Sequence, residues 1–157
     1  TTPFVHAALE RARQRGATTL FMTSVPAEQV PDPADVNIRL LTGPELVAGS
    51  TRLKAGSATK LALNALSTLV MVRLGKVYGN LMVDVDTSAN AKLVERGTRI
   101  LMALLEIPRE EASRALEAAR GKVKVAVVMG RLALEREQAL ERLEKCGDSL
   151  RRVLEET

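Results

Sequence analysis

Hydrophobic positions in the N-terminal part of the chain follow a helical spacing and then two short strand-like runs. Residues 4–16 (FVHAALERARQRG) place apolar side chains on one face of a helix, arginines on the other, and a C-terminal stop at Gly16. Residues 17–25 are typical of a buried strand, and residues 36–41 predict a second strand. The segment between them holds three of the six prolines and predicts a loop. This order of elements is typical of an α/β sheet.

The middle of the chain favours helices. Residues 61–75 (LALNALSTLVMVRLG) are apolar around most of the helix circumference, which predicts a buried helix. Residues 86–105 predict another helix, with Asp86 or Thr87 as its N-cap. A glycine inside that helix, Gly97, costs about 1 kcal/mol relative to alanine unless close packing requires it.

The C-terminal part predicts a small helical bundle. Its pattern indicates three short helices, over residues 110–121, 122–132 and 135–156, separated by glycines and charged turns. We therefore expect an α/β body over residues 1–105 and a three-helix domain over residues 106–157.

Composition narrows the classes of function. Of the 157 residues 46% are hydrophobic but only 2% aromatic, so the core consists of aliphatic side chains, and an aromatic stacking surface for single-stranded nucleic acid is disfavoured. No apolar run reaches the roughly 18 residues that a membrane span needs, because Arg73 and Lys76 interrupt the best candidate, so we expect no membrane-spanning segment. The single cysteine, Cys146, excludes an internal disulfide and fits a reducing cytoplasm.

The positive charge is concentrated in the first half. Residues 1–80 carry nine Lys and Arg against five Asp and Glu, whereas residues 81–157 carry fourteen of each, so the net charge of +4 belongs to the first part. Without a dense basic run, this favours a small anionic ligand as much as a polyanion.

One stretch, residues 43–60 (GPELVAGSTRLKAGSATK), combines glycines, hydroxyls and cations immediately before the apolar helix. A Gly49-Ser50-Thr51 turn leading into a helix is expected to leave backbone N–H groups pointing outward, which suits a phosphate or carboxylate. Arg52 and Lys54 add charge, and Glu45 is placed to accept hydrogen bonds from sugar hydroxyls. The spacing is not a Walker A motif. The residues alone leave a plain helix cap and an anion site equally open.

Other polar residues carry less information. The one histidine, His6, has no partner motif and is expected to be structural or solvent-facing. Lys60, at the head of a helix expected to be buried, is expected near a ligand or carboxylate. Asn80, after Gly79, is either a turn residue or a site contact. Asp84 and Asp86 lack a third ligand, so no metal site is expected.

The stretch from Gly43 to Lys60 resembles the signature shared by bacterial N-acetylmuramic acid 6-phosphate etherases and the animal glucokinase regulatory protein. Residues 73–85 (RLGKVYGNLMVDV) are similar to a second etherase block. Residues 2–19 resemble the etherase segment that follows a Ser-Gly-Arg phosphosugar loop, with Thr2 as one of that loop's last members. The helical tail is similar to the small ubiquitin-associated-like domain that ends these proteins. The resemblance therefore covers essentially the whole chain, as a C-terminal part of the family.

The resemblance implies a SIS (sugar isomerase) α/β sandwich that binds phosphosugars, followed by the small bundle. It implies a lyase that cleaves the D-lactyl ether of N-acetylmuramic acid 6-phosphate to N-acetylglucosamine 6-phosphate and D-lactate, without a metal or organic cofactor. A homodimer in the cytoplasm is expected, with a sugar 6-phosphate as substrate and neither nucleic acid nor membrane as partner. Together with the residue pattern, it indicates these substrate-binding residues: Thr2, Glu45, Ser50, Thr51, Arg52, Lys54, Lys60 and Asn80.

Two departures from the family pattern matter. The resemblance places the main phosphate loop and the acid–base glutamates in the family's N-terminal half, so it assigns no catalytic residue to this chain, and we do not expect activity from this chain alone. The family's strand end reads Ser-Cys-Asn-Pro, whereas here Val25 replaces the asparagine. The alternatives are a sugar-phosphate-sensing regulatory module and a dimerisation scaffold. An uncovered apolar face is expected to cause self-association.

Overall fold

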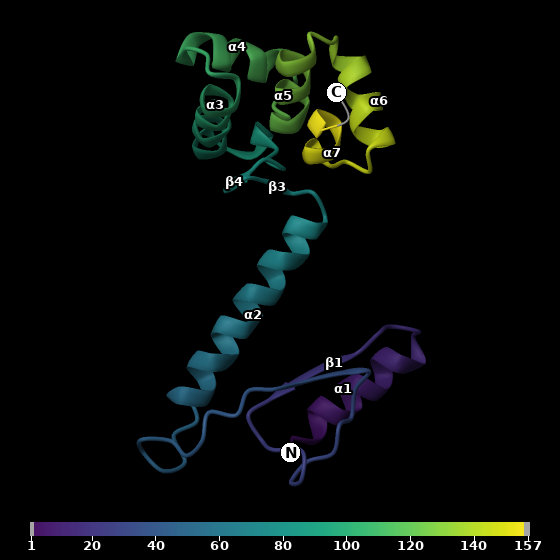
Figure 1. The fold of residues 1–157 in the computed structure, drawn as a ribbon, viewed down its shortest axis with the longest axis vertical. Helices are drawn as coiled ribbons and strands as arrows, with labels where there is room; N and C mark the ends of the chain where they lie inside the picture. Colours follow the sequence, from purple (N-terminus) through teal and green to yellow (C-terminus); the bar gives the residue numbers. More distant parts are fainter. Residues whose placement is uncertain (1, 156–157) are drawn as a thin grey trace. The chain divides into compact units, whose positions relative to one another are not determined.

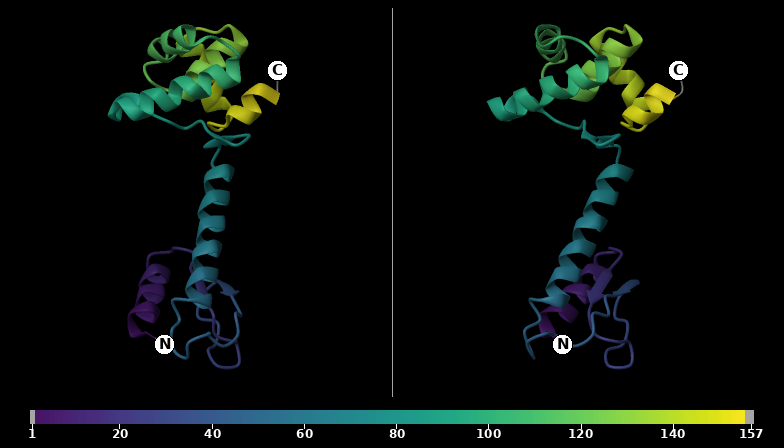
Figure 2. Two further views of the ribbon diagram at one scale, coloured as in Figure 1. Left: turned by 90° about the vertical axis from the view of Figure 1, so that its left-hand side faces the viewer. Right: turned by 60° about the vertical axis from the view of Figure 1, so that its left-hand side comes forward.

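A computed structural model describes residues 2–155, which form a mixed α/β chain of two compact units, Thr1–Leu66 and Ser67–Thr157 (Figure 1). The boundary between the units falls inside a single continuous helix, α2 (Lys54–Arg73) (Figure 2). The α/β class expected from the sequence is confirmed at this level.

The first unit begins with helix α1 (Pro3–Gln14), as the hydrophobic spacing predicts. Proline in its first turn suits the helix start, because proline lacks the N–H that would be unpaired there. The helix is followed by Gly16, whose φ of 74° is the left-handed conformation that glycine adopts most easily. The predicted C-terminal stop at Gly16 is therefore confirmed.

Strands β1 (Leu20–Thr23) and β2 (Val36–Arg39) confirm the two predicted strands and pair in parallel, with Leu20 opposite Val36. The Asp35 carboxylate fixes the entry to both strands, because its Oδ2 accepts hydrogen bonds from the backbone N–H and the hydroxyl of Thr19, each at 2.7 Å. These bonds lower the pKa of Asp35. The prediction that the first strand is buried is wrong, because two strands alone leave both faces partly open.

Arg39 holds the proline-rich loop between the strands. Its guanidinium donates to the backbone oxygens of Val25 and Val30, each at 2.8 Å, and forms an ion pair with Asp32. The loop therefore has a defined path without secondary structure, which explains how a parallel pair forms without an intervening helix.

Helix α2 corrects two expectations. None of its residues is buried, although residues 61–75 predict a buried helix, because the described chain places no apolar surface against it. Its most apolar 18-residue stretch has a mean hydropathy of 1.2, enough by length and composition to cross a membrane, although no such stretch was expected. The expectation was based on Arg73 and Lys76, but Arg73 is the last residue of α2 and Lys76 lies beyond it, so these two charges do not interrupt the helix. Core helices of soluble proteins have the same length and composition.

The second unit opens with an antiparallel hairpin of β3 (Val77–Tyr78) and β4 (Leu81–Met82). A short 3-10 helix, η1 (Thr87–Ala89), comes next and is capped by the Asp86 side chain. Helix α3 (Ala91–Leu105) then begins, with the side chain of Asn90 accepting from the N–H of Leu93 at 3.0 Å. The predicted N-cap at Asp86 or Thr87 is therefore wrong for α3, since η1 intervenes.

Four α-helices follow α3 within the described residues, not the three expected. They are α4 (Arg109–Ala118), α5 (Val123–Leu132), α6 (Arg136–Lys145) and α7 (Leu150–Glu155). The predicted helix over residues 135–156, whose residue 156 lies outside the described part, is broken because Gly147 and Asp148 both have left-handed φ angles, 64° and 57°.

The buried apolar side chains all lie in the second unit, from Val83 to Val153. Helix α5 is central to this core, and α3 packs against both α4 and α5 (Figures 1 and 2). Gly97 of α3 lies where an added methyl group would meet Thr87 Cγ2 at 2.9 Å, so close packing explains this helical glycine. The compact unit thus extends N-terminal to residue 106, and the expected family domain boundary at residues 105/106 stays a prediction.

Candidate functional site

The loop that precedes α2 takes its shape from two glycines. Gly43 and Gly49 have φ angles of 66° and 81°, which other residues rarely adopt. Between them the chain turns tightly: the N–H of Ser50 donates to Val47 O at 3.0 Å and that of Thr51 to Gly49 O at 3.1 Å. These two amides are therefore occupied, and the expectation that they point outward unpaired is wrong.

The anion at the start of α2 is the chain's own Glu45. Its Oε2 accepts from the N–H of Lys54 at 2.8 Å and its Oε1 from that of Ala55 at 3.0 Å. The backbone hydrogen bonds from Ala55 and Lys54 lower the pKa of Glu45. Glu45 therefore caps α2, which is the cap alternative that the sequence left open, although the capping side chain is Glu45 and not Ser50 or Thr51. Each carboxylate oxygen can accept a further hydrogen bond, so the role of Glu45 towards sugar hydroxyls stays a prediction.

The three cations expected around the loop have different environments. Lys54 Nζ donates to the backbone oxygen of Pro44 at 2.7 Å and so closes the loop. Arg52 is exposed and has no hydrogen bond or ion pair within residues 2–155. Lys60 is exposed, so the expectation that it is buried and needs a partner is wrong.

The first turns of α2 line an open hollow of about 530 Å³. Thr51 and Lys60 meet there, together with Thr59 and Asn64, which were not among the predicted substrate-binding residues. The i, i+4 spacing of Lys60 and Asn64 was the sequence signal for this surface. The hollow thus has an amide, two hydroxyls and an ammonium group on its walls.

The remaining predicted residues lie elsewhere. Thr2 precedes α1 in an extended conformation, and its side chain makes no capping hydrogen bond. Asn80 is exposed and lies in the β3–β4 turn of the second unit. Glu45, Ser50 and Arg52 lie in the loop before α2, and Lys54 is the first residue of that helix.

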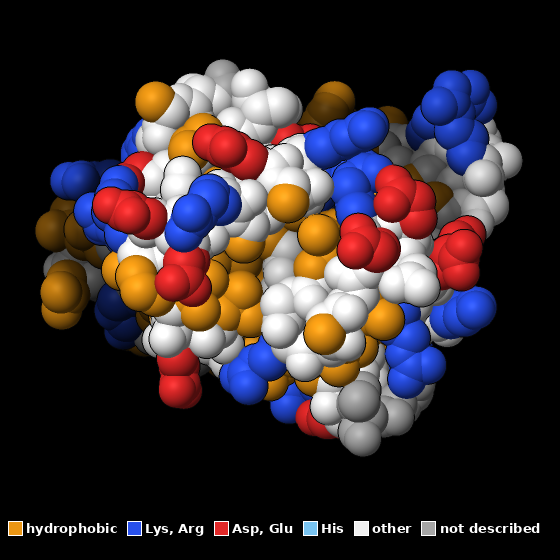
Figure 3. Space-filling model, turned by 90° about the horizontal axis from the view of Figure 1, so that it is seen from above, with side chains coloured by type: hydrophobic (Ala, Val, Ile, Leu, Met, Phe, Trp, Pro, Cys, Tyr) orange, Lys and Arg blue, Asp and Glu red, His pale blue; other side chains and the backbone are white. Residues whose placement is uncertain are grey.

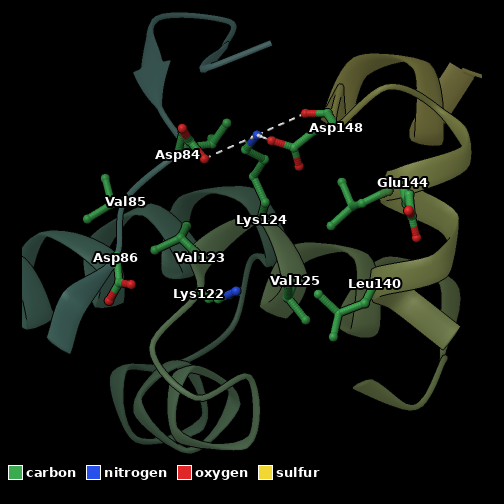
Figure 4. A pocket seen from close by; sticks show the side chains of 12 residues that line it. Asp84, Val85, Asp86, Lys122, Val123, Lys124, Val125, Leu140, Glu144 and Asp148 are labelled. Carbon is green, nitrogen blue, oxygen red and sulfur yellow. Dashed lines mark hydrogen bonds and ion pairs between the residues drawn. The ribbon is translucent and has the colours of Figure 1, made fainter. Parts of the chain in front are cut away.

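A second polar cluster lies in the second unit, around Lys124, and was missed at the sequence level (Figure 4). Lys124 is only 4% exposed, and its Nζ lies 2.5 Å from Asp148 Oδ2 and 3.2 Å from Asp84 Oδ1. It also donates to the backbone oxygen of Asp148 at 2.8 Å. The available signal was a lysine inside the apolar run 123–128.

Asp84 joins this cluster to Lys76, with which it forms a second ion pair. Burial alone would raise the pKa of Asp84, but the hydrogen bonds from Lys76 and Lys124 outweigh it and lower that pKa. The hydrogen bond to Asp84 likewise raises the pKa of Lys76. The cavity beside the cluster measures about 550 Å³, with Asp86 and Glu144 also on its wall. Since all three Nζ hydrogens of Lys124 are engaged, the cluster ties chain segments together.

Metal binding has no support in the described residues: no group of three or more His, Cys, Asp or Glu side chains within the described ranges could hold an ion. On the face of the second unit in Figure 3, positive and negative side chains are interspersed with apolar ones. That face therefore shows no patch of a single charge for a polyanion.

Comparison with known proteins identifies the chain's relatives. Over 155 residues, 99% of this chain, it is 54% identical to an N-acetylmuramic acid 6-phosphate etherase of Synechocystis sp. and 55% identical to that of Microcystis aeruginosa, in each case over 50% of the relative. The etherase of Nostoc punctiforme is 56% identical over 151 residues, 49% of its length. This chain is a homologue of the N-acetylmuramic acid 6-phosphate etherases. It spans about half the length of the curated relatives it matches, and a C-terminal part fits that coverage. No family model matches it.

The expected resemblance to the etherases, as a C-terminal part, is thereby confirmed. The similarity extends over nearly the whole chain and so includes the Gly43–Lys60 stretch with the loop before α2.

Proposed function

We propose that this chain supplies part of the phosphosugar site of an etherase that cleaves the D-lactyl ether of N-acetylmuramic acid 6-phosphate. The observation that carries the proposal is its identity of 54–56% to proteins of that name over nearly its whole length. The proposed protein is a lyase of amino-sugar and peptidoglycan recycling in the cytoplasm, with a SIS-type α/β sandwich and a ubiquitin-associated-like bundle, acting as a homodimer.

The proposed reaction is an elimination followed by hydration. A base removes the proton at C2 of the sugar, the C3–O bond breaks, and D-lactate leaves with the bonding electrons. Water then adds across the C2–C3 double bond, its oxygen at C3 and a proton at C2, to give N-acetylglucosamine 6-phosphate. The products equal substrate plus water, so no oxidant or reductant is required. Carboxylates of raised pKa suit the acid–base steps, and we assign none of them to this chain.

Most of the proposed substrate contacts are in the loop before α2 and in the first turns of that helix. Arg52 and Lys60 are exposed cations without strong competing partners, and Thr51 lines the same hollow as Lys60, a combination suited to a phosphate. Ser50 and Lys54 shape the loop, and Thr2 and Asn80 are also proposed to contact the substrate. The Glu45 carboxylate holds the α2 N-terminus, so an anionic ligand group reaching those amides would displace it.

The decisive test is D-lactate release from N-acetylmuramic acid 6-phosphate, followed with lactate dehydrogenase. The chain is assayed alone and together with a polypeptide that matches the other half of the Synechocystis relative. Release in the mixture, abolished by Arg52→Ala with Lys60→Ala, is the expected result. Sugar-phosphate binding by calorimetry without any lactate release would instead support a sensing module. If the mixture shows no binding and no release, the proposed phosphosugar site is contradicted.

A further inference from the structure

Helix α2 ends in a bend, residues 74–76, that has a defined backbone conformation. The N–H of Gly75 donates to Val72 O and that of Lys76 to Met71 O, each at 3.0 Å, which is the Schellman pattern of a helix C-terminus. Gly75 has a φ of 70°, a conformation that other residues rarely adopt. The bend therefore depends on one glycine, and it lies within the second unit.

The turn between α6 and α7 lies directly against this bend. A methyl group added at Gly75 would lie 3.1 Å from the backbone oxygen of Asp148 and 3.1 Å from Cα of Ser149. Both neighbouring atoms belong to the backbone, so they cannot rotate away as the end of a side chain can. Position 75 therefore has room for glycine only, for a reason that is separate from its φ angle.

An alternating series of charges joins the same two segments. Lys76, in the bend, pairs with Asp84, and Asp84 Oδ1 lies 3.2 Å from Lys124 Nζ. Lys124 Nζ in turn donates to Asp148 twice, to Oδ2 at 2.5 Å and to the backbone oxygen at 2.8 Å (Figure 4). Lys124 is only 4% exposed, so salt in the solvent screens these attractions little. The backbone oxygen of Asp148 therefore lies beside the bend and also binds the buried ammonium group.

Helix α7, which follows this turn, has six residues, too few to be stable as an isolated helix. It is held by the burial of Leu150 and Val153 and by Arg151, whose guanidinium lies 6.0 Å from the centre of the Tyr78 ring. Asp148, in the turn, has a left-handed φ of 57°, which is unfavourable for a residue with a side chain. A short helix that follows a strained turn is expected to detach before the longer helices of the core open.

We infer that residues 147–155, the turn and α7, form a clamp on the bend after α2, and that detachment of α7 converts this bend into a hinge. While the clamp is closed, the backbone contact at Gly75 and the ion pair of Lys76 hold the last turn of α2 in one direction. Once it opens, Gly75 has the wide range of backbone angles that glycine allows, and hinges are commonly a few such residues at the end of an element. The inference concerns the second unit alone and depends neither on the proposed reaction nor on the homology.

The test is a matched pair of glycine variants followed by amide hydrogen exchange. Gly75→Ala inserts a methyl group between the bend and the clamp, and it should raise the exchange rates of the α7 amides by about tenfold or more, as when one element opens separately from the core. Gly79→Ala, in the β3–β4 turn, has a similar φ of 58°, but an added methyl group there meets no described atom within 4 Å. It should leave α7 exchange unchanged, and exchange in α5 should stay slow in both variants.

The reciprocal variant is Asp148→Asn, which removes the charge of the clamp. Because coupling between two segments acts in both directions, it should raise the exchange rates of the Gly75 and Lys76 amides by about fivefold or more. Glu144→Gln changes an exposed carboxylate on the wall of the same cavity and should leave these two amides unchanged.

The hinge itself is measured with spin labels on Arg73→Cys and Arg114→Cys, at exposed positions of α2 and α4. Labelling is carried out under native conditions, in which the Cys146 thiol is buried. Double electron–electron resonance should give a narrow distance distribution in the otherwise unmodified chain and in Gly79→Ala, and a broader one in Gly75→Ala.

Three results would overturn the inference. Equal α7 exchange in the two glycine variants, whether raised or unchanged, would show that the contact at Gly75 does not hold α7. A rise of α7 and α5 exchange together would show that both helices open as one unit. A narrow distance distribution despite fast α7 exchange in Gly75→Ala would show that no hinge forms.

Discussion

The Glu45 carboxylate accepts a hydrogen bond from the backbone N–H of Lys54 at 2.8 Å, nine residues further along the chain. Its other oxygen accepts from Ala55, so a single side chain neutralises two of the unpaired donors at the start of α2. One side chain therefore joins the loop to the helix by hydrogen bonds, and its substitution should loosen both the loop and the first turn of α2.

Glu45→Ala should raise the exchange rates of the Lys54 and Ala55 amides, because both lose their acceptor. Glu45→Gln should have a smaller effect, since one amide oxygen still accepts a hydrogen bond. Hydrogen exchange by NMR measures both, with Glu28→Ala, at an exposed loop position, as the control. Equal exchange in Glu45→Ala and the unmodified chain would contradict the capping role.

Glu95 should titrate far below its usual range. Hydrogen bonds from Arg109 and then Arg99 lower the pKa of Glu95 from 4.5 to about 2. Because the folded chain releases this proton more readily than the unfolded chain, its contribution to stability is present above pH 4.5 and is lost as the pH falls towards 2. Carboxyl chemical shifts should give a midpoint near 2, which Arg109→Ala moves upward. Arg114→Ala, on the same helix, should leave it in place.

The buried ammonium of Lys124 should depend on both aspartates. Asp84→Asn and Asp148→Asn should each lower the free energy of unfolding of the second unit by about 1–3 kcal/mol, because a buried charged donor loses its ionised acceptor. Adding Lys124→Met to the double variant should recover stability, since no buried charge then remains unpaired. Urea unfolding followed by circular dichroism measures each variant.

The control for that series is Glu144→Gln, a carboxylate on the wall of the same cavity that is exposed to solvent. It should change stability by less than about 0.5 kcal/mol. If Glu144→Gln lowered the free energy of unfolding as much as Asp148→Asn does, the effect would come from negative charge at the cavity and not from the hydrogen bond to Lys124.

Gly97→Ala should destabilise the second unit despite the better helix propensity of alanine. The added methyl group would lie 2.9 Å from Thr87 Cγ2 and 3.1 Å from Val123 Cγ2, both on buried residues. Overpacking costs about 1–3 kcal/mol, more than the roughly 1 kcal/mol gained from propensity. Thermal unfolding should show a lower midpoint than for Gly130→Ala, where the contacted atoms all belong to the flexible end of one partly buried side chain, Leu105.

Local features of this chain were predictable from sequence, and features that join distant residues were not. Helix α1, its stop at Gly16 and both parallel strands follow from periodicity and turn residues within a few positions. The break between α6 and α7 was missed although Gly147 and Asp148 are ordinary turn residues. The helical spacing of apolar residues continues across this turn, and for that reason the sequence predicted one helix in place of two.

The site shows the same division. An anion at the start of α2 was predictable from the physics of helix ends, but its identity as Glu45 was not, because nine residues of loop separate acceptor and donor. Likewise Lys124 meets Asp84 and Asp148 from positions 40 and 24 residues away. The burial of Lys60 was expected from the apolar residues that follow it, but no part of the described chain covers that helix.

The confinement of the buried apolar core to residues 83–153 has a consequence for biosynthesis. Those residues form helices whose contacts are mostly short in sequence, a topology that folds rapidly. Translation runs from the N-terminus, so the segment with β1, β2 and α2 leaves the ribosome before the only core in the described chain exists. During that interval its apolar helix is a natural substrate for chaperones, and the C-terminal bundle, although made last, should be the first part of this chain to complete its fold.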